Sequence, residues 1–369
     1  MEKEQQEKLI QIAQKFKIEG AIHTITPYGS GHINDTYLVT MQAGEAGGNG
    51  AKRFILQRMN TAIFTKPQEL MENIVGVTHH LKQKILSKGG DPKRETLSLV
   101  KTESGEEYFV TKAGDYYRMY DFIEGAVSYD AVKEPRDFYE SAVAFGRFQY
   151  LLSDYPAKTL HETIPDFHNT VKRYEDLETA IMADAAGRRK LVEPEIAFIR
   201  ARRAEFGRLL ELQHAGRLPL RVTHNDTKLN NIMMDRKTGR GICVIDLDTV
   251  MPGLSLYDFG DSIRFGANTG AEDEVDLKKV SLDLSLYRLY KKGYLEGSKG
   301  SLTETEIEML PAGAKLMTLE CGMRFLTDYL NGDTYFKIHR EHQNLDRCRS
   351  QFALAADMEK KWDAMCKED

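Results

Sequence analysis

RVTHNDTKLNNIMMDRKTGRGICVIDLDTV, residues 221–250, carries short apolar runs beside a cluster of polar side chains. The segment RKTGR between two of these runs favours a tight turn, so we expect neighbouring short strands here. The cluster HNDTKLNN, residues 224–231, contains Asp226 and Asn231, and Asp246 ends the last apolar run. One such residue alone would usually cap a turn. The three at this spacing instead indicate a site for chemistry.

The polar cluster has the side chains that magnesium-assisted phosphoryl transfer needs. That reaction uses a carboxylate to orient the acceptor hydroxyl and take its proton, and hard oxygen ligands to hold Mg²⁺ against the phosphates. Asp226 is the predicted base, and Asn231 and Asp246 are the predicted metal ligands. Lys228 could neutralise charge on the transferring phosphoryl group, or it could be a solvated loop lysine. These residues predict a kinase that uses ATP and Mg²⁺.

The first third of the chain has the pattern of a small antiparallel sheet with helices. A charged helix opens the chain, and residues 21–26, 36–41 and 52–59 read as three strands joined by glycine-bearing turns. A helix follows from Pro67 to Lys84, and the runs at residues 96–100, 108–111 and 116–123 suggest two or three more strands. We therefore expect a first domain over residues 1–123.

Beyond residue 123 the sequence changes to long amphipathic helices, interrupted by the strand-like segment that contains the polar cluster. We expect a second, mostly helical domain over residues 124–369, which makes the chain an α+β protein of two domains. Its length of 369 residues fits this division.

Composition excludes several classes of partner. The formal net charge of −5 gives no basic field for nucleic acid or an anionic membrane surface. The sequence has no run of 18 apolar residues and no signal peptide at its charged N-terminus, so we expect no membrane partner and a cytoplasmic protein. Its four cysteines are widely spaced, which fits reduced thiols rather than a disulfide framework.

The motif H-x-D-x-K-x-x-N followed by I-D resembles the aminoglycoside phosphotransferase and choline kinase superfamily, within the protein-kinase-like fold. Further segments resemble the bacterial N-acetylhexosamine 1-kinases over nearly the whole chain. These segments are PYGSGHIND (27–35), RFILQRMN (53–60), IDLDTVMPG (245–253), SIRFGA (262–267) and ECGMRFLTDYLNGD (320–333). The resemblance implies a bilobal fold with a small antiparallel-sheet N-lobe, which covers the nucleotide, and a larger helical C-lobe.

The resemblance also implies a reaction and a set of sugar contacts. The reaction is ATP-dependent phosphorylation of the anomeric 1-hydroxyl of N-acetylglucosamine or N-acetylgalactosamine. Asp226 would be the base. The side chains implied to contact or line the sugar are His32, Arg324, Tyr335 and Phe265, with Arg264 as a weaker neighbouring candidate. Asp258, in YDFGD, would brace the catalytic segment.

Three segments are predicted to bind the nucleotide: the glycine-bearing loop, residues 118–127, and the third strand with Gln57 or Arg58. Gly29, Gly31 and Asn34 lie in a loop between two strands, where glycines allow close backbone approach to phosphate, although an ordinary hairpin turn would use the same residues. RMYDFIEGAV, residues 118–127, resembles the segment between kinase lobes, and its Phe122 and Ile123 are predicted to lie at the adenine.

The third strand departs from the kinase pattern. Where V-A-I-K would place a phosphate-binding lysine, RFILQRMN has Gln57 and Arg58. Arg58 could fork onto phosphate oxygens with Glu72 as its partner, whereas Gln57 offers a neutral amide. Alternation along a strand prevents both from facing the same side.

Two alternatives to a sugar kinase remain open. The catalytic residues would equally serve a kinase for choline, ethanolamine, homoserine or an aminoglycoside. The missing strand lysine is also compatible with a nucleotide-binding pseudokinase, although Asp226, Asn231 and Asp246 argue against it. The preference between the two N-acetylhexosamines and the oligomeric state do not follow from the sequence.

Overall fold

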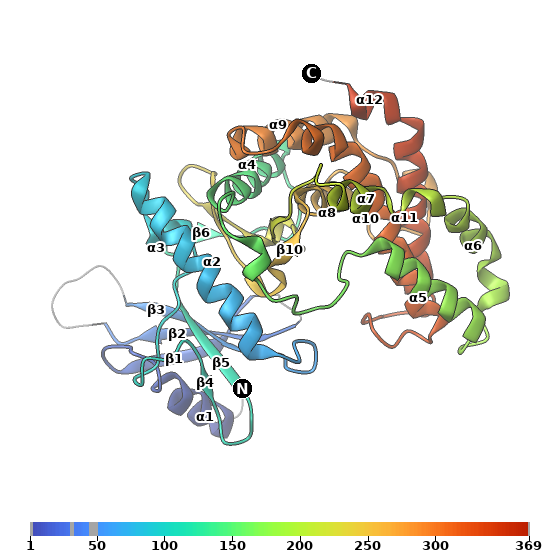
Figure 1. The fold of residues 1–369 in the computed structure, drawn as a ribbon. Coiled ribbons are helices and arrows are strands. Elements are labelled where there is room, and N and C mark those ends of the chain that lie inside the picture. Colours follow the sequence, from blue (N-terminus) through green and yellow to red (C-terminus); the bar gives the residue numbers. More distant parts are fainter. Residues whose placement is uncertain (1–2, 30–32, 44–50, 368–369) are drawn as a thin grey trace. The chain divides into compact units, whose positions relative to one another are not determined.

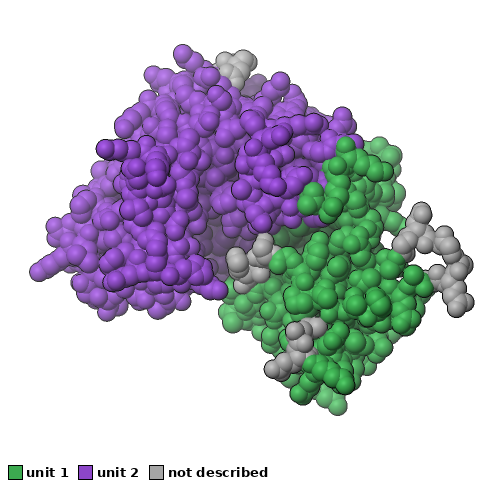
Figure 2. All heavy atoms as spheres, turned by 180° about the vertical axis from the view of Figure 1, so that it is seen from behind, with its two compact units in different colours: residues 1–127, 235–237, 242–248 green, residues 128–234, 238–241, 249–369 purple. Residues whose placement is uncertain are grey.

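The computed structural model describes residues 3–29, 33–43 and 51–367. The chain forms two compact units, drawn in different colours in Figure 2: unit 1 has residues 1–127, 235–237 and 242–248, and unit 2 has residues 128–234, 238–241 and 249–369. The predicted α+β class, with an antiparallel-sheet N-terminal region and a helical C-terminal part, is confirmed. Unit 1 takes two short segments from the predicted second domain, and the division at residue 123 stays a prediction.

Unit 1 is built around a five-stranded antiparallel sheet of order β1-β2-β3-β5-β4 (Figure 1). Its elements are α1 (Lys3–Ala13), β1 (Ile22–Pro27), β2 (Asp35–Met41), β3 (Arg53–Arg58), α2 (Pro67–Ser87), α3 (Pro92–Glu95), β4 (Phe109–Val110), β5 (Tyr116–Asp121) and β6 (Ala126–Val127). The three predicted opening strands are confirmed. The run at residues 96–100 does not form a full strand of this sheet; it pairs with β5 only at one isolated bridge, between Leu99 and Tyr120, with two backbone hydrogen bonds around it.

The two faces of this sheet differ in chemistry. Leu9 and Ile12 of α1 pack in one apolar cluster with Leu56 of β3 and with Tyr117 and Met119 of β5. Because side chains alternate along a strand, the residues between these lie on the opposite face. We call this opposite face the Arg118 face, after the buried arginine that it carries together with Gln57.

Unit 2 is mostly helical. Its helices are α4 (Pro135–Leu151), α5 (Thr170–Ala183), α6 (Glu193–Arg200), α7 (Arg208–His214), α8 (Ser255–Gly266), α9 (Leu284–Ser298), α10 (Glu304–Leu330), α11 (Gln343–Lys360) and α12 (Trp362–Cys366). The short strands after residue 220 are β7 (Arg221–Thr223), β8 (Ile232–Asp235), β9 (Gly241–Val244) and β10 (Met251–Gly253); the last residue of β8 and most of β9 belong to unit 1. None of the helices within the described ranges is long and apolar enough to cross a membrane.

Close packing of α8 against α10 fixes the helix on which the site rests. A methyl group at Gly260 would lie 2.5 Å from the carbonyl oxygen of Gly313, closer than atoms can approach, so only glycine fits there. Helix α10 begins at a capping box of Thr303 and Glu306, each of which binds the backbone N–H of the other. The contact between α8 and α10 holds the position of α8, which bears the buried residues Asp258 and Asp261.

Candidate active site

The candidate catalytic segment, residues 224–231, starts where β7 ends. β7 pairs antiparallel with β10, with Thr223 opposite Met251. Asn225 then has a φ of 66°, a left-handed conformation that asparagine tolerates better than most residues. The segment closes with a 3₁₀ turn, Leu229–Asn231. The chain thus leaves a short strand, turns sharply and presents its polar side chains within one turn.

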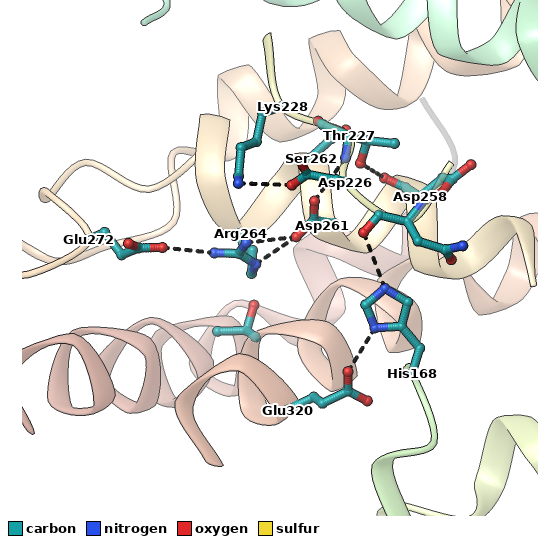
Figure 3. Close-up of polar contacts among 12 residues, drawn as sticks. His168, Asp226, Thr227, Lys228, Asp258, Asp261, Ser262, Arg264, Glu272 and Glu320 are labelled. Atoms are coloured by element: carbon teal, nitrogen blue, oxygen red, sulfur yellow. Dashed lines mark hydrogen bonds and ion pairs between the residues drawn. The ribbon is translucent and has the colours of Figure 1, made fainter. Parts of the chain in front are cut away.

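The carboxylate of Asp226 contacts two other predicted residues of its own segment, of which Figure 3 shows Lys228. The Lys228 Nζ atom is 2.8 Å from Asp226 Oδ1, and the Asn231 side chain donates a hydrogen bond of 3.1 Å to Oδ2. Asn231 also donates to the Asp226 backbone carbonyl at 2.8 Å. Because the amide N–H groups are used in this way, the oxygen of Asn231 is the atom that could face a cation. Asp226 itself keeps 29% side-chain exposure, which a base in contact with a substrate needs.

Asp258 on α8 braces the catalytic segment, as predicted. Its carboxylate accepts hydrogen bonds from the backbone N–H groups of His224 at 3.0 Å and Asn225 at 2.8 Å, and from the side chain of Gln149 at 2.9 Å. Burial raises the pKa of Asp258, while these donors oppose the rise. The brace therefore reaches the backbone directly before Asp226.

Asp261, one turn further along α8, forms the second support (Figure 3). It accepts from the backbone N–H of Thr227 at 2.9 Å and pairs with Arg264, whose Nη2 lies 2.7 Å from Oδ1. Burial tends to raise the pKa of Asp261, but the positive charges of Arg264 and Lys228 outweigh it and lower the pKa. Arg264 is buried in this ion pair, so its position is that of a support for the segment.

His168 touches the same segment and is itself held by Glu320; neither was predicted as a site residue, although Glu320 opens the segment ECGMRFLTDYLNGD. His168 Nδ1 lies 2.7 Å from Glu320 Oε1 (Figure 3), and its Nε2 lies 3.4 Å from the backbone carbonyl of Asn225. Glu320, on α10, also accepts from Thr170 at 2.6 Å. This contact links α10 to the sharp turn at Asn225.

The predicted sugar residues lie mainly on α10 and the loop after it. The Arg324 guanidinium is 5.2 Å from the ring centre of Phe167 and 5.5 Å from that of Phe336. Tyr335 is exposed and packs edge-on against Phe336. The structure thus brings Arg324 and Tyr335 to one aromatic cluster. Phe265 lies near the end of α8, and His32 lies outside the described residues.

Asp328 organises the loop that carries Tyr335, and it was missed in the sequence. Its buried carboxylate accepts from the backbone N–H groups of Thr334, Tyr335 and Phe336 at 2.8–2.9 Å. This arrangement repeats, in another loop, the way Asp258 holds the catalytic segment. The motif LTDYLNGD contains Asp328, but nothing in it reveals three backbone donors.

In unit 1, the predicted nucleotide loop is described only in part. Gly29 has a φ of 79°, which suits glycine, and Gly31 lies outside the described residues. The Asn34 side chain donates to Asp248 Oδ2 at 2.6 Å and accepts from the backbone N–H of Asn60 at 3.0 Å. Asn34 thus ties the end of the loop to the chain just after Asp246.

Gln57 and Arg58 face opposite sides of the sheet. Arg58 shares its side with α1, half-exposed, with Nη2 2.7 Å from Asp115 and Nη1 3.3 Å from Asp35. Gln57 lies on the Arg118 face, donating to Thr36 at 3.1 Å and accepting from Arg118 Nε at 3.0 Å. Their roles in nucleotide binding stay predictions.

The remaining predicted residues of unit 1 lie after β5 and after β9. The Arg53 guanidinium lies over the Phe122 ring, 4.1 Å from its centre, and Ile123 is buried. Asp246 has a φ of 59°, a strained backbone of the kind found at functional sites. Within the described ranges, no group of three or more His, Cys, Asp or Glu side chains could hold a metal. The predicted donors, one amide and one carboxylate, are hard oxygens that suit Mg²⁺ when water and phosphates complete its shell.

The family profile of the phosphotransferase enzyme family matches residues 24–289, and the chain belongs to this family. Among solved structures, a microcompartment-associated aminopropanol kinase has 16% identity and a TM-score of 0.64, covering 98% of this chain and 99% of that one. A spectinomycin phosphotransferase in complex with ADP and spectinomycin has 13% identity and a TM-score of 0.57, with 96% and 98% covered. A choline kinase from Cryptosporidium parvum Iowa II has 13% identity and a TM-score of 0.56, with 97% and 96% covered. At these identities the likeness is one of fold.

Proposed function

We propose that this protein is an ATP-dependent kinase that phosphorylates the anomeric 1-hydroxyl of N-acetylhexosamines, acting in the cytoplasm. The observation that carries the proposal is the position of Asp226, whose carboxylate lies 2.8 Å from Lys228 Nζ and accepts a hydrogen bond from Asn231. A carboxylate fixed by two neighbours and still accessible is suited to take the proton of an alcohol.

In the proposed reaction each residue of the segment has one task. Asp226 orients the sugar hydroxyl and accepts its proton as the oxygen attacks the γ-phosphorus of ATP. Lys228, beside it, supplies positive charge near the transferring group. Asn231 and Asp246 would hold Mg²⁺, which neutralises phosphate charge when bound. Asp258 keeps the backbone before Asp226 in place through two N–H groups.

The proposed nucleotide contacts are Gly29, Gly31, Asn34, Phe122 and Ile123. Of the two residues predicted at the position of the strand lysine, Gln57 and Arg58, only Gln57 lies on the Arg118 face. Support comes from the family and from the similar spectinomycin phosphotransferase, whose structure contains ADP. A nucleoside triphosphate is the ordinary phosphoryl donor for such chemistry, and we propose ATP.

The proposed sugar contacts are Arg324, Tyr335, Phe265 and His32. Arg324 brings guanidinium donors beside two aromatic rings, Phe167 and Phe336. Such donors suit the hydroxyl and acetamide oxygens of a neutral sugar, and aromatic rings suit its apolar face. A fixed positive charge disfavours choline and aminoglycosides, which are cations themselves.

A kinase for an amino alcohol or an aminoglycoside is the second candidate, because the similar folds include an aminopropanol kinase and a choline kinase. The deciding experiment measures turnover of Mg·ATP with N-acetylglucosamine, N-acetylgalactosamine, glucose, galactose, choline, ethanolamine, homoserine and an aminoglycoside. Phosphorus NMR of the product identifies the phosphorylated oxygen. We expect an anomeric phosphate from the N-acetylhexosamines. Turnover of a cationic acceptor alone would replace the sugar, and nucleotide binding without turnover of any acceptor would indicate a pseudokinase.

A further inference from the structure

The Arg118 face carries a buried cation on β5, one strand away from the position where the kinase pattern places a lysine. Arg118 is opposite Gln57 in the β3–β5 register, and its side chain is 1% exposed. Its Nε donates to Gln57 Oε1 at 3.0 Å. Gln57, at the lysine position of the pattern, therefore contacts a positive charge without carrying one.

Arg58 does not supply this charge to the Arg118 face. It lies on the α1 side of the sheet, where its guanidinium pairs with Asp115 and Asp35. Lys8 of α1 lies 3.7 Å from the same Asp115. The carboxylates that surround Arg58 would also repel a phosphate.

One end of the Arg118 guanidinium is paired and the other is not. Nη2 lies 2.6 Å from Asp248 Oδ1, whereas Nη1 is buried without a hydrogen-bond partner among the described residues. Buried polar atoms are nearly always hydrogen-bonded, and this donor is available to an acceptor from outside the chain. The planar guanidinium can hold a carboxylate with one edge and a phosphate with another.

Asp248 connects Arg118 to two other predicted nucleotide segments of unit 1. Its Oδ2 accepts from Asn34, at the end of the glycine loop, at 2.6 Å. It also follows Asp246, the predicted metal ligand, within one short turn, Leu247–Thr249. Arg118 is thus fixed beside the loop and the metal ligand that the proposed function assigns to the phosphates.

We propose that Arg118 binds the phosphates of the nucleotide and replaces the lysine that β3 lacks. This inference rests on the proposed use of a nucleotide but not on the identity of the acceptor. Arg118 Nη1 donates to a phosphate oxygen, while Asp248 and Gln57 hold the side chain in position. The positive charge that a lysine on β3 would supply comes instead from the neighbouring strand, β5. Gln57 holds the Arg118 side chain in position.

The test compares two ligands that differ only in phosphates. The affinities of the full chain for ADP with Mg²⁺ and for adenosine are measured by calorimetry, for the wild type, Arg118→Met and the control Arg94→Met. Arg94 pairs with Asp235 at 2.7 Å, so the control also removes an arginine–aspartate pair from unit 1. We expect Arg118→Met to weaken ADP binding at least about tenfold and adenosine binding less than about twofold, and Arg94→Met to change neither. ADP binding within twofold of wild type, or equal losses for both ligands, would overturn the inference.

Moving the charge back to β3 separates phosphate binding from a purely structural role. In the Arg118→Met background, Gln57→Lys should restore most of the lost ADP affinity, because residues 57 and 118 are cross-strand neighbours. No recovery would contradict the inference. If Arg118→Met does not fold, the double variant Arg118→Gln with Asp248→Asn replaces it, because it removes both charges of the buried pair. Its affinities for ADP and for adenosine are then compared with those of the wild type by the same criteria. A wild type that bound neither ligand would instead overturn the proposed function.

Discussion

The candidate catalytic segment and the Arg118 face are both clusters of charged and amide side chains, but they are assembled differently. In the catalytic segment, Asp226 and Asn231 are five positions apart in the chain. On the Arg118 face, Arg118 and Gln57 are 61 positions apart in the chain. Asp248, which pairs with Arg118, is 214 positions from Asn34, its other partner. The first cluster could be recognised from a short motif, whereas the second could not.

The supports of the two clusters differ as well. The catalytic segment is held by backbone N–H groups that donate to Asp258 and Asp261 of one helix, α8. The Arg118 face is held by side chains from several strands and loops. We therefore expect substitutions in the first region to affect turnover, and substitutions in the second to affect nucleotide affinity.

The largest expected effect is at Asp226. Asp226→Asn keeps the shape of the side chain but removes the proton acceptor, so kcat should fall on the order of a thousandfold. Affinity for ADP, measured by calorimetry, should stay within about twofold of wild type. A variant that keeps near-normal turnover would remove Asp226 from the role of base.

The second prediction concerns the two aspartates that organise loops. Asp258→Ala leaves buried N–H groups of His224 and Asn225 without an acceptor and should lower the free energy of unfolding by about 3 kcal/mol, measured by urea denaturation. Asp328→Ala, the matched variant, removes the acceptor for three backbone N–H groups and should cost a similar amount.

Asp258→Ala and Asp328→Ala should lose similar stability but differ in their kinetic parameters. Asp258→Ala should lower kcat, because it loosens the segment before Asp226. Asp328→Ala should raise the sugar KM, because it releases the loop of Tyr335. The same kinetic defect in both would contradict the separate tasks of the two loops.

A smaller effect is expected at Arg324. Arg324→Met keeps contact with Phe167 and Phe336 but loses the guanidinium donors, so the KM for the sugar should rise about tenfold while the KM for ATP is unchanged. Arg347→Met is the control, because Arg347 lies 5.4 Å from the ring centre of a neighbouring residue, Phe325. Equal changes in both variants would show that Arg324 has no specific contact with the sugar.

The smallest effect is a pH dependence from Asp261. Its folded-state pKa is lowered, so its pair with Arg264 stabilises the fold above the pKa of the unfolded chain, about 4, and this contribution is lost as pH falls through the folded-state pKa. Urea denaturation between about pH 5 and pH 3 should show a steeper loss of stability in the wild type than in Asp261→Asn. Parallel curves would contradict the ionised pair.

Several parts of the fold and site follow from local pattern. Strands β1, β2 and β3 and helix α2 were predicted from alternation and helical periodicity, and the five-residue spacing of Asp226 and Asn231 identified the segment that α8 braces. Residues 96–100 have the composition of a strand, but their pairing with β5 is limited to one bridge, between Leu99 and Tyr120, because strand composition does not specify how far a pairing extends.

The sequence alone determined which side chains can do chemistry near residue 226, because that cluster is set by a few consecutive backbone angles. Only the tertiary structure decided where the other contacts fall: Arg58 with carboxylates beside α1, Arg118 opposite Gln57, and His168 against the carbonyl of Asn225. The physical reason is that strand register and helix packing join residues far apart in the chain. The burial of Arg118, which distinguishes it from a surface arginine, also depends on this packing and cannot be read from the sequence.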